Sequence, residues 1–269
     1  MSYTYYYKKS NMLHGSLLNI MGTGLDALMI GKEEVVSSVW DAIVLEIKRL
    51  HHMLNRFDTS SEISYINNNA CIYPVKVSDE LWRILLDTGR YHQQTLGYFD
   101  ITLSDYTRLY FDKENHSVFF DGYRISLDLG GYAKGYALKK IQEIFLDSDI
   151  RQALVNFGNS SVLAVGSHPH GKSWNIGVEH PFQPKVQLKI FELSGNSLST
   201  SGNTSQHKNH IIDPHSGVFI SEKKMVSVVS TNCIDAEVLT TALMVADSES
   251  VGKIQANFPG AASYTFNLQ

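Results

Sequence analysis

The sequence predicts an α+β fold, with a mostly antiparallel sheet and helices segregated from it. Four segments carry apolar residues at helical spacing, and three of these begin before residue 135. Short segments rich in β-branched and aromatic residues are most frequent in the second half of the chain. This segregated order favours an antiparallel sheet with separate helices over a doubly wound parallel sheet.

The first predicted helix covers residues 33–54, where apolar side chains form one face and polar ones the other. A second helix begins after a Ser78 cap and continues through Tyr91. A third opens after Gly130-Gly131, and a fourth covers Ala236–Val245. Each of these segments has a face apolar enough to pack against a sheet.

The predicted strands start with a hairpin, in which Ser117–Phe120 pairs with residues 123–127 around the turn Asp121-Gly122. Further strands are expected at residues 153–157, 162–165, 174–178, 186–193 and 225–230.

Length and composition exclude several classes of protein. The 269 residues suggest one large domain or two intimate ones, and 43% apolar with 11% aromatic residues exclude intrinsic disorder. With 23 basic and 27 acidic residues, a net charge of −4 argues against a mainly electrostatic nucleic-acid binder. Cys71 and Cys233 are expected to be reduced thiols, because two distant cysteines give no disulfide framework.

The sequence as written shows no targeting signal, and a cytoplasmic protein is therefore expected. No apolar run reaches the length of a membrane span, so no membrane-spanning helix is expected. The first 16 residues lack the apolar core of a secretory signal. A leader removed from the sequence would change this expectation to a periplasmic or lipoprotein-anchored location.

The segment Asp128–Tyr136, DLGGYAKGY, is the most informative single motif. A strand-like segment ends at an acid, two glycines turn the chain, and Lys134 falls in the first turn of a helix. Backbone N–H groups at a helix start attract phosphate, and the lysine adds a cation for the same anion. A plain glycine-rich turn with a solvated lysine fits the same residues.

Two further stretches carry polar residues in suggestive patterns. His210–Gly217, HIIDPHSG, places an imidazole and a carboxylate around two apolar residues, but it also fits a strand ending in a turn capped by Asp213. Upstream, residues 199–205 offer hydroxyls around a glycine, which suits phosphate contacts and equally suits any turn.

The segment Asp235–Leu243 combines a carboxylate and a hydroxyl on one helix face. Glu237 and Thr241 are four residues apart, and such hard oxygen donors would suit Mg²⁺. The alternative is an ordinary helix start capped by Asp235.

In their order along the chain, these motifs resemble those of the ApbE family, the FAD:protein FMN transferases or flavin transferases. The resemblance covers about residues 18–247 and rests on Met21-Gly-Thr23, Asn55–Asp58 with Ser61–Ser64, Gly97–Thr102, DLGGYAKGY, Val155–Gly158, HIIDPHSG and AEVLTTAL. It implies an ApbE-like fold in a single domain over residues 1–269, with residues 1–17 peripheral.

The resemblance also implies a set of site residues, carried over motif by motif. FAD would be lined by Met21, Phe57, Tyr98, Phe99, Asp100, Asp128, Lys134 and Ile211. Mg²⁺ would be held by the carbonyl of Gly131 with Glu237 and Thr241. His210 is the candidate general base, because it is the imidazole at the head of the HIIDPHSG motif.

The implied reaction is Mg²⁺-dependent transfer of FMN from FAD to a Thr or Ser hydroxyl of an acceptor protein, with release of AMP. The alternative is a relative that binds FAD, or hydrolyses its pyrophosphate, without efficient transfer. Three departures from the family pattern bear on this choice: Glu237 stands where Asp is usual, Lys139 where an acid is common, and the segment 103–116 is short.

Overall fold

The computed structural model describes residues 1–123, 125–183, 185–203 and 211–268. Its helices are α1 (Glu33–Leu54), α2 (Glu62–Asn69), α3 (Asp79–Gln94), α4 (Gly130–Asp147), α5 (Cys233–Val245) and α6 (Ser248–Ala256), with a 3-10 helix at Tyr106–Arg108. Its strands are β1 (Ser2–Tyr7), β2 (Met12–Ile20), β3 (Thr23–Ile30), β4 (Val75–Lys76), β5 (Leu109–Asp112), β6 (Ser117–Phe120), β7 (Ala153–Phe157), β8 (Ser161–Val165), β9 (Trp174–Glu179), β10 (Gln187–Leu193), β11 (Ser197–Gly202), β12 (Ile212–Asp213), β13 (Val218–Phe219), β14 (Lys224–Ser230) and β15 (Ala261–Asn267).

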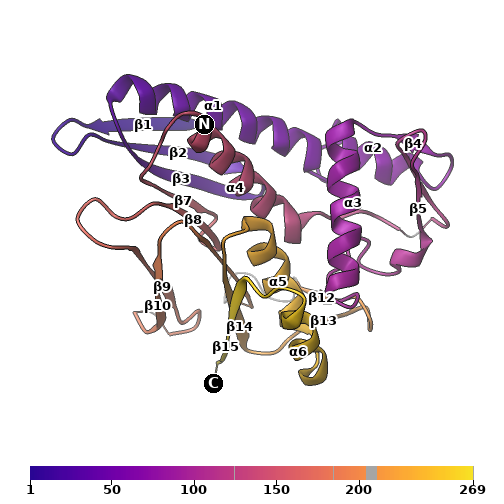
Figure 1. The fold of residues 1–269 in the computed structure, drawn as a ribbon. Helices are drawn as coiled ribbons and strands as arrows, with labels where there is room; N and C mark the ends of the chain where they lie inside the picture. The colour runs from indigo at the N-terminus through magenta and orange to yellow at the C-terminus, as the bar shows by residue number, and fades with distance from the viewer. Residues whose placement is uncertain (124, 184, 204–210, 269) are drawn as a thin grey trace.

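An eight-stranded sheet in the order β1-β2-β3-β7-β8-β11-β14-β15 forms the centre of the fold. Every neighbouring pair in it is antiparallel. Helices α1, α4 and α5 pack against this sheet (Figure 1). The predicted α+β fold, with an antiparallel sheet and segregated helices, is therefore confirmed.

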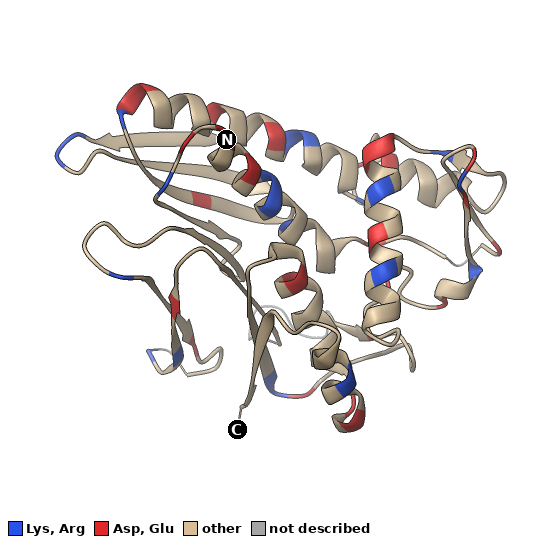
Figure 2. Ribbon diagram, viewed as in Figure 1, with Lys and Arg blue, Asp and Glu red and all other residues tan. Residues whose placement is uncertain are grey.

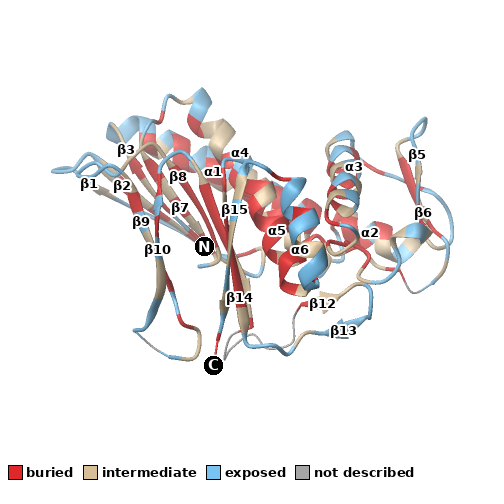
Figure 3. Ribbon diagram, turned by 60° about the horizontal axis from the view of Figure 1, so that its bottom comes forward, coloured by how far each residue is buried: buried red, intermediate tan, exposed pale blue. Residues whose placement is uncertain are grey.

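The two faces of the sheet belong to two apolar cores. Leu163 of β8 faces the main core with the helices, whereas its neighbours Val162 and Ala164 face a smaller core under the β9–β10 hairpin. This alternation follows from the two-residue period of a strand. Helix α5 lies at the middle of the main core and is buried along most of its length (Figure 3).

A second group of elements consists of α2, α3 and the small sheet β4-β6-β5 (Figure 1). Helix α3 joins it to the main core, because the Tyr91 ring packs edge-on against Tyr132 of α4 and stacks on Phe258. The segment between α3 and α4 carries several site residues, so this packing positions one wall of the site.

The predicted helices match α1, α3, α4 and α5, and Ser78 caps α3 by accepting a hydrogen bond from the Leu81 N–H. The predicted hairpin is wrong. Strand β6 pairs with β5 and β4, whereas residues 125–127 form no strand. The reason is that the Asn67 side chain pairs with both the N–H and the carbonyl of Leu127 and takes the place of a strand partner.

Residues 1–17, expected at the periphery, supply strand β1 and most of β2. Leu13 and Leu17 are buried in the main core, so the peripheral part is only the edge strand β1. Among the described residues, no helix has both the length and the apolar character needed to cross a membrane.

Candidate functional site

A cavity of about 280 Å³ lies where α4 and α5 meet the loop after α3. It brings together nine residues that the sequence predicted for one site: Tyr98, Phe99, Asp100, Asp128, Gly131, Lys134, Ile211, Glu237 and Thr241. Leu103, Gly130, Ser201, Ile212 and Pro214 complete the lining. Residues from four distant motifs therefore share one cavity.

Two glycines of α4 allow close packing against α5. A methyl group on Gly131 would lie 3.0 Å from the Thr241 hydroxyl oxygen and 3.3 Å from the Phe99 ring. A methyl group on Gly135 would lie 2.7 Å from the carbonyl oxygen of Cys233 and 2.9 Å from Cβ of Glu237. Real Cβ atoms essentially never come as close as the two Gly135 distances, and the Gly131 distances would require a shift of a few tenths of an ångström. The motif GGYAKG therefore sets the contact between the two helices.

Glu237 is the centre of a buried polar network. Glu237 is only 4% exposed, and its Oε1 accepts a hydrogen bond from the Lys134 ammonium. Its Oε2 accepts from the hydroxyls of Ser161 at 2.6 Å and Ser199 at 2.9 Å. A carboxylate this deeply buried needs such partners, because removal from water otherwise disfavours its charge.

The hydroxyls of β11 support this network instead of standing free for phosphate. Ser199 donates to Glu237, the Thr200 hydroxyl lies 2.8 Å from that of Ser227, and Ser201 donates to Thr240 at 2.9 Å. Ser201 also lines the cavity. The rest of the serine and threonine stretch, from residue 204 onward, lies outside the described residues.

Asp128 stands at the entrance of α4 with a partner on each oxygen. Its Oδ1 accepts from the Gly130 N–H at 2.8 Å, and its Oδ2 lies 3.3 Å from Nε of Arg56. The arrangement places a carboxylate at the positive end of the helix dipole. Asp100 has a local role, because its Oδ1 accepts from the N–H and hydroxyl of Thr102, both at 2.7 Å.

Two predicted residues that the structure describes, Met21 and Phe57, do not line the cavity. The Met21 N–H donates to Nδ1 of His51, and its side chain packs against the main core. The Phe57 ring is 81% exposed beneath the Arg56 guanidinium. His210 lies outside the described residues, so its predicted role as a base stays a prediction.

Sequence reasoning missed two features of this site. His215, the second imidazole of HIIDPHSG, packs its ring 4.5 Å from that of Tyr98. The motif itself contained that signal. Ser161, in contrast, meets Glu237 across 76 positions of the chain, and nothing in its local sequence indicates that contact.

The helix start expected at Asp235 is capped by Asn232 instead. The Asn232 side chain accepts from the Ile234 N–H at 3.0 Å. Asp235 lies in the first turn and accepts from the Tyr91 hydroxyl, which ties α5 to α3. The alternative reading of this segment as a mere helix start is therefore incomplete, because Glu237 and Thr241 both reach the cavity.

Comparison with known proteins identifies the family. The model of the ApbE family matches residues 21–121 and 105–265. This chain belongs to the ApbE family. A relative from Chlamydia muridarum named FAD:protein FMN transferase is 28% identical over 233 residues, which cover 72% of this chain and 71% of that protein. One of the same name from Klebsiella pneumoniae is 23% identical over 261 residues, with 83% and 79% covered.

Solved ApbE structures share the fold. The ApbE protein of Thermotoga maritima has a TM-score of 0.81 at 21% identity, over 100% of this chain and 97% of that chain. The flavin transferase ApbE from Vibrio cholerae has a TM-score of 0.80 at 21% identity, over 94% and 96% of the two chains. The mixed architecture of helices and antiparallel sheet is thus the ApbE architecture.

Proposed function

We propose that this protein transfers FMN from FAD to a Thr or Ser hydroxyl of an acceptor protein and releases AMP. The observation that carries the proposal is the cavity between α4 and α5, where Lys134, Glu237 and Thr241 converge. The names of the Chlamydia and Klebsiella relatives support the same activity. Cleavage of a pyrophosphate needs positioning and neutralised oxygen charge more than covalent help, and this cavity offers both.

The residues at the junction fit a hard divalent cation in donor type. The Thr241 hydroxyl makes only a long 3.4 Å contact to the carbonyl of Glu237, so it keeps acceptor capacity. Gly131 has no side chain to cover that hydroxyl. Carbonyl, hydroxyl and carboxylate oxygens are the ligands that Mg²⁺ prefers, so Gly131, Glu237 and Thr241 are the proposed holders. When bound, Mg²⁺ would neutralise charge on the phosphate oxygens.

Glu237 enters this site already neutralised by Lys134. Its Oε2 is held by two serine hydroxyls, which fix the carboxylate in one orientation. Lys134, whose side chain is 21% exposed, reaches the cavity as well as the carboxylate. We propose that its ammonium contacts a phosphate oxygen of FAD while Glu237 keeps it in place.

In the proposed reaction, the acceptor hydroxyl oxygen forms a bond to the phosphorus of the FMN half. The bond from that phosphorus to the bridging oxygen breaks, and AMP leaves with the electron pair. The hydroxyl proton passes to a base, for which His210 is the candidate from the family motif. Asp128 and the first turn of α4 would orient the pyrophosphate, because N–H groups at a helix start favour bound phosphate.

The experiment is incubation with FAD and Mg²⁺, with and without a peptide that carries a flavinylation-type threonine. Mass spectrometry of the peptide and chromatography of the nucleotides follow FMN addition and AMP release. Metal-dependent AMP together with an FMN-labelled peptide is the expected result. FMN and AMP without labelling would indicate a hydrolase, and saturable FAD binding without turnover would indicate a binding protein; either would overturn transfer to this peptide.

A further inference from the structure

A second cavity, of about 350 Å³, lies on the other side of α4. Its walls come from α3, α4 and the first turn of α5. It shares no lining residue with the cavity between α4 and α5, which is called the flavin-site cavity from here on because FAD binding is proposed there. Its volume falls within the range of small-molecule sites, about 300–1,000 Å³.

Basic side chains outnumber acidic ones in this second cavity. Arg90 pairs with Asp87 at 2.7 Å, and Lys140 pairs with Glu143 at 2.8 Å, so both lining acids are neutralised. The basic and acidic residues alternate along α3 (Figure 2).

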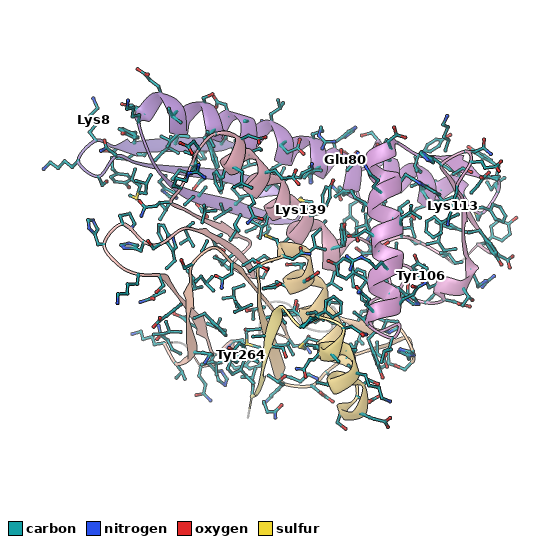
Figure 4. The ribbon with its side chains drawn as sticks, in the orientation of Figure 1. Lys8, Glu80, Tyr106, Lys113, Lys139 and Tyr264 are labelled. Carbon is teal, nitrogen blue, oxygen red and sulfur yellow. The ribbon has the colours of Figure 1, made fainter. Side chains whose placement is uncertain are left out.

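Two cations, Arg83 and Lys139, have no ion-pair partner within the described residues. They reach the cavity from α3 and α4 respectively. Figure 4 shows Lys139 on α4, on the side of that helix toward α3. The two lining cations without an ion-pair partner therefore come from opposite walls, Arg83 from α3 and Lys139 from α4.

Two carboxylates lie just behind the lining, and neither forms an ion pair with Arg83 or Lys139. Glu80 accepts from the Arg49 guanidinium at 2.6 and 2.9 Å and from the Tyr136 hydroxyl at 2.8 Å. Asp235 accepts from the Tyr91 hydroxyl and from the Asn232 amide. Because both donors to Asp235 are neutral groups, this carboxylate keeps its charge and offsets part of the positive charge of the lining. Arg83 and Lys139 still have no ion-pair partner within the described residues, so both can pair with a ligand.

The tyrosines of the cavity are held neutral. Burial raises the pKa values of the three hydroxyls, and the carboxylates that accept their hydrogen bonds raise them further; the three are Tyr91, Tyr132 and Tyr136. Each hydroxyl already donates to a carboxylate. The charged donors of the lining that have no ion-pair partner within the described residues are therefore the Arg83 guanidinium and the Lys139 ammonium. Donors that carry charge bind oxyanions most strongly.

We propose that this cavity is a second binding site, for a small molecule that carries a phosphate group. The Arg83 guanidinium matches the geometry of phosphate oxygens, and Lys139 supplies a second charge from the opposite wall. The N-terminal turn of α5, capped by Asn232, adds its positive dipole to the same side. Lys139 lines this second cavity and not the flavin-site cavity, so the proposed reaction does not already use it.

Calorimetric titration with inorganic pyrophosphate tests the proposal, at about 0.15 M ionic strength to screen loose surface charge. The wild-type protein should bind saturably. Arg83→Gln and Lys139→Gln should each weaken binding about tenfold, because each removes one charge. Lys113→Gln, at the β5–β6 turn labelled in Figure 4, is the control and should bind as the wild type does.

Two further arms keep the outcome unambiguous. Pyrophosphate binding that persists in Lys134→Gln belongs to the second cavity, whereas binding lost there belongs to the flavin site and overturns the proposal. Tighter binding of citrate than of pyrophosphate would overturn the phosphate assignment. Absent binding, or equal binding by the Arg83 and Lys139 variants, would overturn the site itself. None of these readouts depends on flavin transfer.

Discussion

Helix α4 separates two cavities that differ in whether their charged side chains are paired. On one side, Lys134 and Glu237 neutralise each other inside a buried network. On the other, Arg83 and Lys139 are exposed and keep their charges free of any ion pair among the described residues. A closed network fixes its groups for chemistry, whereas free exposed cations can only attract and hold an anion.

The largest expected effect comes from breaking the network of the flavin-site cavity. Glu237→Ala leaves the Lys134 ammonium and the hydroxyls of Ser161 and Ser199 without their acceptor. We expect a loss of about 3–5 kcal/mol in the free energy of unfolding, measured in urea, together with loss of turnover. Glu237→Gln keeps the size of the side chain and should lower AMP release about 100-fold with a smaller loss of stability.

Glu143→Ala is the matched control on the other side of α4. Its carboxylate pairs with Lys140 but is 46% exposed. Its loss should change the free energy of unfolding by no more than about 1 kcal/mol. An effect as large as that of Glu237→Ala would remove the distinction between the two cavities.

The contact between α4 and α5 is the next point to break. Gly135→Ala places a methyl group 2.7 Å from a backbone carbonyl of α5, so one helix must move. We expect destabilisation of about 1–3 kcal/mol, read as a lower thermal midpoint. Gly252→Ala in α6, where a methyl group meets nothing within 4 Å, should be neutral or slightly stabilising. Equal midpoints for the two variants would contradict this packing.

Gly131→Ala sharpens the comparison by changing the flavin-site cavity without breaking the fold. Its methyl group would crowd the Thr241 hydroxyl, which must give by a few tenths of an ångström. Turnover should fall about tenfold with little change in stability, because catalysis is more sensitive to position than folding is. The concentration of Mg²⁺ needed for half-maximal AMP release should rise, and an unchanged value would argue against Thr241 as a ligand.

The smallest effect is expected for binding alone. Asp128→Ala removes the acceptor of the Gly130 N–H and the partner of Arg56, so FAD affinity should fall about tenfold in a titration. Asp147→Ala, at the exposed end of the same helix, is the control and should leave the affinity unchanged. If FAD binds Asp128→Ala as tightly as the wild type, the aspartate serves the turn and not the ligand.

Local signals predicted much of this fold, and contacts between distant segments account for the failures. Helix α1 was predicted with its observed ends, because its apolar spacing and its burial agree. The false hairpin arose because Asp121-Gly122 looks like a turn, whereas the chain turns after Asp112, whose carboxylate accepts from the Glu114 N–H. Asn67 then pairs with Leu127 across 60 positions, which no local pattern announces.

The candidate site shows the same division. Residues within motifs, such as Asp128 and Thr241, were found from the sequence. Ser161 was not, because its role depends on a hydrogen bond from β8 to Glu237 of α5 and on nothing nearby in the chain. Phe57 was placed by resemblance, yet its ring lies outside the cavity lining.

A pair of lysines on α4 tests the central claim most directly. Lys134 faces the flavin-site cavity, and Lys140, six residues further along, lies on the other side with Glu143. AMP release from FAD is measured for the wild type, Lys134→Gln and Lys140→Gln under the same conditions. We predict a loss of about 100-fold for Lys134→Gln and a change within about twofold for Lys140→Gln. Equal losses in both variants, or a larger loss for Lys140→Gln, would contradict the assignment of the chemistry to the cavity between α4 and α5.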